Sequence, residues 1–141
     1  MGSPEVESVL AHLPSIKEPG RSFVVRWVND ERDDGSFVMP YPDYTDDVHH
    51  LFDALGDLLS SWGGVDADYM RVSTLVRSPD AIAVATPIEL RAMLTFLVRG
   101  ERFCDGFQEG MLEAGYVALM LDRLKELYEH GDLTHHPNQP T

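Results

Sequence analysis

The chain has 141 residues, of which 43% are hydrophobic and 25% are charged, and its formal net charge is −13. This length and composition predict one globular domain, and the charge argues against direct binding to a nucleic-acid backbone, which requires clustered Lys and Arg. No apolar run approaches the roughly 20 residues that cross a bilayer, and the N-terminus lacks an apolar leader. We therefore expect a cytoplasmic protein without membrane contact, and the single Cys104 fits a reducing compartment.

The N-terminal third predicts a short helix followed by a β-hairpin. Ser3 and Pro4 form a helix-start pair, and apolar residues then recur at helical spacing until Pro14. Residues 22–28 are β-branched and aromatic, which indicates a strand. Residues 36–41 can return as the second strand after an Asp-Gly turn signal.

The rest of the chain predicts helices. Thr45 begins the clearest amphipathic pattern, with apolar residues at steps of three and four as far as Trp62. Further helices are expected over residues 66–77, 86–100 (opened by a Thr-Pro-Ile-Glu capping box), 101–114 and 116–130. The predicted fold is mainly α: a single compact bundle of five to six helices with a small β-hairpin near the N-terminal third. It spans residues 1–131, and residues 132–141 form a flexible tail.

A ladder of small residues lies on the predicted helix 101–114. Gly106, Gly110 and Ala114 recur every four residues and share one helical face. This stripe predicts a seam against which another helix packs closely.

Residues 98–127, VRGERFCDGFQEGMLEAGYVALMLDRLKEL, resemble the C-terminal signature of domain of unknown function 6508, a family of small bacterial proteins. The matching residues are Arg99, Arg102, Phe103, Gly106, Gly115, Arg123 and Leu124. Upstream, Trp27, the Met39-Pro40-Tyr41 run and the helix after Thr45 follow the same order of elements. The resemblance implies one compact α-rich domain, and that family carries no established activity to transfer.

Acidic residues gather in one part of the chain. Between residues 30 and 57 the only basic residue beside them is Arg32, and the carboxylates are Asp30, Glu31, Asp33, Asp34, Asp43, Asp46, Asp47, Asp53 and Asp57. This pattern indicates a non-enzymatic protein-interaction or regulatory module that presents an anionic face to a basic protein partner or to another copy of itself. A nucleic-acid mimic that inhibits a DNA-binding protein is an alternative, and a high-salt habitat or solubility alone would give the same composition.

A basic strip supports a different function. Arg91, Thr95, Arg99 and Arg102 follow each other at steps of four, four and three, and guanidinium groups bind oxyanions in a bidentate manner. A small-molecule or anion-binding domain, or an enzyme, would use Arg99, Arg102, Asp105 and Tyr41 as its pocket. The structural alternative is that these arginines pair with neighbouring acids and tie helices together.

Other candidate groups point to packing or solvent exposure. His49 and His50 lie among Asp46, Asp53 and Asp57, but one helix supplies too few converging ligands, so no metal site is predicted. Cys104 is expected to pack in the core. The aromatic and Met residues that flank the acidic turn form either a contact surface or the seat of the hairpin; they are Trp27, Met39, Tyr41 and Tyr44. No catalytic residue and no cofactor are predicted, since no catalytic or cofactor motif is complete.

Overall fold

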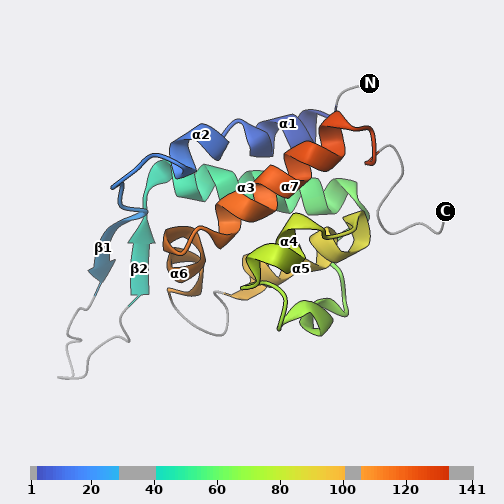
Figure 1. Ribbon diagram of the computed structural model, residues 1–141. Helices are drawn as coiled ribbons and strands as arrows, with labels where there is room; N and C mark the ends of the chain where they lie inside the picture. The colour runs from blue at the N-terminus through green and yellow to red at the C-terminus, as the bar shows by residue number, and fades with distance from the viewer. Residues whose placement is uncertain (1–2, 29–40, 101–105, 134–141) are drawn as a thin grey trace.

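Three amphipathic helices, α3 (Asp46–Ser61), α5 (Pro87–Gly100) and α7 (Tyr116–Glu129), supply the centre of the core. The computed structural model describes residues 3–28, 41–100 and 106–133, and Figure 1 shows these three helices with shorter ones around them. Helices α3 and α7 bury one face because their apolar residues recur at steps of three and four, whereas α5 is buried over most of its circumference. The largest fully buried side chains include Leu51, Leu55, Leu58, Leu90, Met93, Leu94, Leu97, Met120 and Leu121.

Shorter elements cover this centre. They are α1 (Pro4–Leu10), α2 (Leu13–Ile16), β1 (Val24–Val28), β2 (Tyr41–Tyr44), the 3-10 helix η1 (Tyr69–Val72), α4 (Pro79–Ala83) and α6 (Phe107–Glu113). Helix α1 packs on α3 and α7, α4 packs on α7, and η1 packs on α5. The hairpin projects from the helical body at the end where α3 begins (Figure 1). The predicted mainly α bundle with a small hairpin is therefore confirmed.

Two predicted helix starts have the expected hydrogen bonds. The hydroxyl of Ser3 accepts from the backbone N–H of Val6 at the start of α1. At the start of α5, the N–H of Glu89 donates to Thr86 Oγ1 at 3.1 Å, and the N–H of Thr86 donates back to the Glu89 carboxylate at 2.9 Å. This reciprocal pair satisfies two backbone donors, so α5 begins where the sequence predicts.

The helix predicted over residues 66–77 is wrong, since only η1 forms there. Asp66 does not cap a helix. Its carboxylate accepts from the guanidinium of Arg71 and from the backbone of Asp68, and its own N–H donates to Thr95 Oγ1 on α5 at 3.1 Å. Arg91, also on α5, is only 6% exposed and donates to the carbonyls of Gly64 and Val65. The loop residues 64–66 are therefore bonded to α5, and the backbone bonds of residues 68–78 form η1 and separate turns instead of one continuous helix.

The first predicted helix is divided, and the tail is partly packed. Helix α1 ends at Leu10, and Pro14 lies in the first turn of α2, where the missing N–H of proline leaves no bond unmade. Leu133 packs against the core from within the predicted tail, whereas residues 134–141 lie outside the described residues.

The second strand of the hairpin lies later in the chain than the sequence predicts. Strand β1 agrees with the predicted strand, but β2 covers Tyr41–Tyr44 and only meets the end of the predicted second strand, whose residues 36–40 lie outside the described residues. Pro42 lies within β2, opposite Trp27. A proline is tolerated there because a two-stranded ribbon leaves one side of each strand without a ladder. The register shifts beside Val25, which is the residue left without a partner.

The hydroxyl of Thr95 holds the loop after α3 on α5, which predicts a stability loss for Thr95→Val. The variant keeps the side-chain volume but leaves the buried N–H of Asp66 without an acceptor. We expect a cost of about 1–3 kcal/mol in the free energy of unfolding, measured by urea denaturation. The exposed Ser60→Ala in α3 serves as the control and should change little. Equal midpoints for Thr95→Val and the wild type would contradict this role.

Candidate functional site

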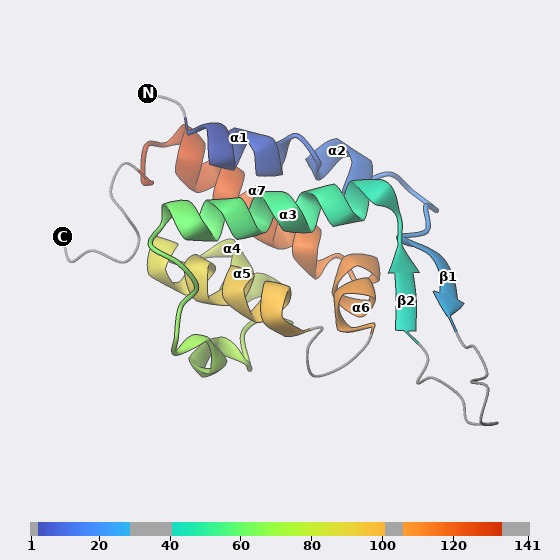
Figure 2. The ribbon, with the colours of Figure 1, turned by 180° about the vertical axis from the view of Figure 1, so that it is seen from behind.

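The outward face of α3 carries an acidic stripe, defined here as Asp46, Asp53 and Asp57. These residues follow each other at steps of seven and four, so they share one side of the helix, and all three are exposed. None of the three carboxylates makes a hydrogen bond or ion pair with any residue that the structure describes. Figure 2 shows α3 along the front of the molecule, between α1 and α2 on one side and α5 on the other. The stripe is therefore open to a partner.

The other predicted acidic residues are divided. Asp30, Glu31, Asp33 and Asp34 lie outside the described residues. Asp43 lies on β2 opposite Arg26, and its carboxylate is 3.8 Å from Arg26 Nε, although both side chains are largely exposed. His49 and His50 are exposed beside the stripe. No group of three or more potential metal ligands comes together within the described part of the chain.

Asp47 belongs to the fold and not to the acidic stripe. Its carboxylate accepts hydrogen bonds from Arg21, from Ser15 and from the hydroxyl of Thr45. These contacts join the start of α3 to α2 and to the loop before β1. The hydrogen bond from Arg21 holds the pKa of Asp47 far below its ordinary value, and the hydroxyl groups of Thr45 and Ser15 add to that shift. The sequence does not indicate this cluster, because Arg21 and Asp47 lie far apart in the chain and no motif relates them.

The aromatic residues of the hairpin have two different roles. Tyr44 is buried, and its hydroxyl accepts from the N–H of Glu109 at 3.0 Å, so it seats the hairpin on α6. Trp27 packs on Gly106, whose φ is +89° and where a Cβ would lie 2.7 Å from the indole. Tyr41 is 43% exposed on β2, and Val25 is 66% exposed at the bulge. The hairpin thus combines a packed inner side with apolar groups open to solvent. Met39 lies outside the described residues.

The predicted packing seam along Gly106, Gly110 and Ala114 is wrong. Gly110 and Ala114 are exposed, and a Cβ on Gly110 would meet no heavy atom within 4 Å. Helix α6 begins only at Phe107 and buries a different side, formed by Gln108, Met111 and Leu112. The small residues instead line an open groove of about 320 Å³, and its other lining residues are Arg77, Phe107, Met111 and Tyr116.

A row of aromatic rings beside this groove has an arginine at each end. Tyr69 and Phe96 meet edge to face at 5.9 Å between ring centroids, and Phe96 lies 5.6 Å from Phe107. The Arg99 guanidinium lies 5.7 Å from the Tyr69 centroid, and that of Arg77 lies 5.4 Å from the Phe107 centroid. The sequence does not indicate this row, because its rings come from three separate elements, η1, α5 and α6.

Only part of the predicted arginine pocket lies within the described residues. Arg91 and Thr95 bind the loop after α3 and so have structural roles. Arg99 has a buried Nε with no hydrogen-bond partner among the described residues, while Arg102 and Asp105 lie outside them. Tyr41 lies on the hairpin, and α6 stands between the hairpin and α5 in both views (Figures 1 and 2). A pocket formed by Arg99, Arg102, Asp105 and Tyr41 stays a prediction. Cys104 is also outside the described residues.

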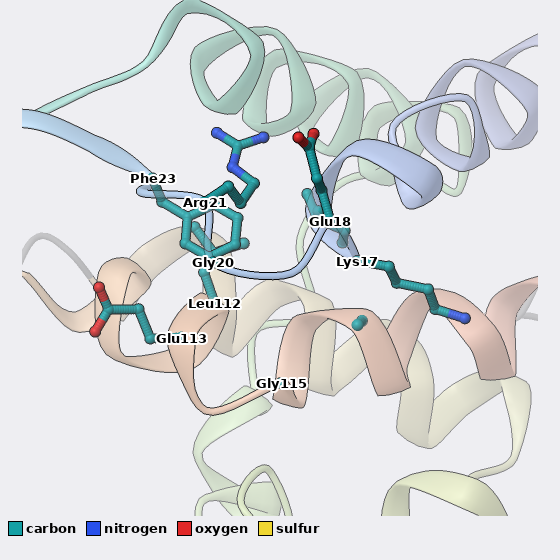
Figure 3. A pocket seen from close by; sticks show the side chains of 10 residues that line it. Lys17, Glu18, Gly20, Arg21, Phe23, Leu112, Glu113 and Gly115 are labelled. Atoms are coloured by element: carbon teal, nitrogen blue, oxygen red, sulfur yellow. The ribbon is translucent and has the colours of Figure 1, made fainter.

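A second hollow, of about 360 Å³, lies between the loop before β1 and the junction of α6 with α7 (Figure 3). Its basic side chains are engaged elsewhere: Lys17 Nζ lies 2.7 Å from the Asp122 carboxylate, and Arg21 binds Asp47. Figure 3 shows the head groups of Glu18 and Arg21 pointing away from Gly20 and Leu112. The basic side chains that line this hollow are therefore already paired with carboxylates and offer no free cation to a ligand.

The cluster around Asp47 predicts a specific response to acid. Bonding in the folded state lowers the pKa of Asp47, so its ionised carboxylate adds to the free energy of unfolding. This contribution is fully present above the unfolded-state pKa of about 4, and it is lost as the pH falls through the folded-state pKa. We expect Asp47→Asn to cost about 1 kcal/mol at neutral pH, allowing for the solvent that reaches this carboxylate, and clearly less near pH 2, where the unfolded-state carboxyl is protonated.

Urea denaturation at both pH values measures this difference, and Asp53→Asn is the matched control, because Asp53 is on the same helix without a described partner. A penalty for Asp47→Asn that persists unchanged in acid would contradict the assignment.

Comparison with known proteins gives a family but no activity. No curated protein matches the chain, and no solved structure matches it. None of the described helices is both long and apolar enough to cross a membrane. The chain matches the family of unknown function DUF6508 over residues 1–130 and therefore belongs to that family.

Proposed function

We propose that this protein is a non-enzymatic interaction or regulatory module of the cytoplasm that presents an anionic face to a basic protein partner. The face consists of the acidic stripe on α3, together with Asp43 and the exposed Tyr41 of the neighbouring strand β2. A DNA-binding protein would be one kind of partner with the required charge.

The observation that carries the proposal is that Asp46, Asp53 and Asp57 are exposed on one side of a long helix without a described ion pair. The carboxylates that the fold requires, those of Asp47 and Asp66, are instead bound to arginines. The stripe runs from Asp46 to Asp57 on α3, which is about 16 Å along the helix axis. A partner with basic side chains at matching intervals would contact all three carboxylates at once.

Charge alone does not give a tight complex. An exposed ion pair contributes only about 0–1 kcal/mol, because water screens it and both side chains lose freedom. Val25 and Tyr41 on the hairpin supply apolar area beyond the end of the stripe where α3 begins. The expected partner therefore combines basic residues with an apolar contact, and the stripe contributes mainly to association rate and to partner choice.

A second copy of the chain is a weaker candidate for the partner. Two copies each carry a net charge of −13 and repel one another unless a basic surface faces the stripe. Sedimentation velocity at low and high salt would separate the two cases: self-association that grows with salt would favour a second copy over a basic partner.

The proposal predicts that removing the stripe weakens binding of a basic probe. The probe is a synthetic amphipathic helix with lysines on one side and leucines on the other. Asp46→Asn, Asp53→Asn and Asp57→Asn combined should weaken its binding about tenfold, since three exposed ion pairs contribute about 0.5 kcal/mol each. Titration calorimetry at several salt concentrations measures the effect, which should shrink as salt screens the charges.

The matched control neutralises three exposed acids elsewhere: Asp80→Asn, Glu129→Gln and Asp132→Asn. It changes the net charge by the same amount and should lose clearly less affinity than the stripe variant. Equal losses in the two triple variants, or binding that is independent of salt, would refute a specific anionic face.

A further inference from the structure

The groove beside α6 combines apolar lining residues with two polar ones. Phe107 and Ala114 supply apolar surface above the buried Met111, while Arg77 and Tyr116 are the lining residues with polar side-chain atoms. A volume of about 320 Å³ is at the lower end of the range of roughly 300–1,000 Å³ seen for small-molecule sites. The groove therefore has the size and the mixed chemistry of a site for a small ligand.

Arg77 is the feature that indicates the charge of this ligand. It is exposed, it lies against the ring of Phe107, and it makes no hydrogen bond or ion pair with any described residue. This contrasts with Arg21, Arg71 and Arg123, each of which is bound to a carboxylate. In a chain with 24 acidic and 11 basic residues, a cation that lines a hollow and has no carboxylate partner among the described residues is available to an external anion.

The small residues Gly110 and Ala114 leave space in the groove for a ligand. Gly110 lines the groove, and a side chain there would extend into open space. A larger residue at this position would fill the place of a ligand without disturbing a neighbour. Glycine in the middle of a helix lowers helix stability, so the open groove is kept despite a cost to α6.

We propose that this groove binds a small organic acid, with its carboxylate on Arg77 and its apolar body against Phe107 and over Gly110 and Ala114. A polyanion such as nucleic acid is excluded by the net charge of the whole chain, whereas a single carboxylate carries little of that repulsion. This site is independent of the proposed anionic face, because Arg77 and the acidic stripe lie on different elements.

The test compares three probes that differ only in their polar group: 3-phenylpropanoate, 3-phenylpropanamide and 3-phenylpropylamine. Each is titrated into the ¹⁵N-labelled full-length chain, and backbone amide shifts are followed by NMR. We expect the acid to shift the amides of Gly110 and Ala114 and to bind at least about tenfold more tightly than the amide. The amine should bind most weakly, since its cation meets the Arg77 guanidinium.

Two variants locate the site. Arg77→Gln should weaken acid binding about tenfold and remove the preference for acid over amide, whereas Lys125→Gln, which removes an exposed cation elsewhere, should not. Gly110→Leu should abolish binding of both the acid and the amide. Its control is Gly56→Leu on α3, where a Cβ also meets nothing within 4 Å, and this variant should bind as the wild type does. Circular dichroism confirms that each variant is folded.

Three results would overturn the proposal. One is equal affinity for the acid and the amide in the wild type. Another is unchanged acid binding in either Arg77→Gln or Gly110→Leu. The third is a set of amide shifts that lies away from α6 and the start of α7. The triple variant of the acidic stripe should bind the acid normally, so that loss of basic-probe binding and loss of acid binding are distinguishable outcomes.

Discussion

The burial of the apolar residues of α3, α5 and α7 is the constraint on which the rest of the surface depends. An α-helix with apolar residues at steps of three and four has to turn its remaining residues outward. On α3 this places Leu51, Leu55 and Leu58 in the core and leaves Asp46, Asp53 and Asp57 in solvent. The acidic stripe is thus a direct consequence of the same periodicity that makes the core.

Charged residues in the described part of the chain fall into two groups. One group forms ion pairs and hydrogen bonds within the fold: Arg21 with Asp47, Arg71 with Asp66, and Arg91 with the carbonyls that follow α3. These bonds hold the loop before β1 and the segment after α3 in place. The other group is left outside, with carboxylates on α3 and the cation of Arg77 beside α6. The two proposed binding surfaces therefore have opposite charge and take different ligands.

Helix α6 determines the shape of the second surface. Gln108 donates to the carbonyls of Leu97 and Val98 at the end of α5, and the ring of Phe107 fills the space beside Gly100. Tyr44 binds the backbone of Glu109 from the hairpin side. These three contacts set the rotation of a short helix. With that rotation, Gly110 and Ala114 face solvent and form the floor of the groove.

The sequence alone determined the helical class, the hairpin, the start of α5 and the outward face of α3. Each of these follows from neighbours within one or two turns: the capping box of Thr86 and Glu89, or the spacing of apolar residues after Thr45. Membership of the family could also be inferred, because Arg99, Gly106, Gly115 and Arg123 stand at its spacing.

Only the tertiary structure decided which way Gly110 faces, why residues 66–77 do not form a full helix, and where Arg77 lies. The physical reason is that each of these depends on partners distant in the chain. Thr95 takes the backbone N–H of Asp66, and Phe107 and Gln108 orient α6 on α5. A small residue at helical spacing fits a packed seam and an open groove equally well, and the difference arises only from what stands opposite it.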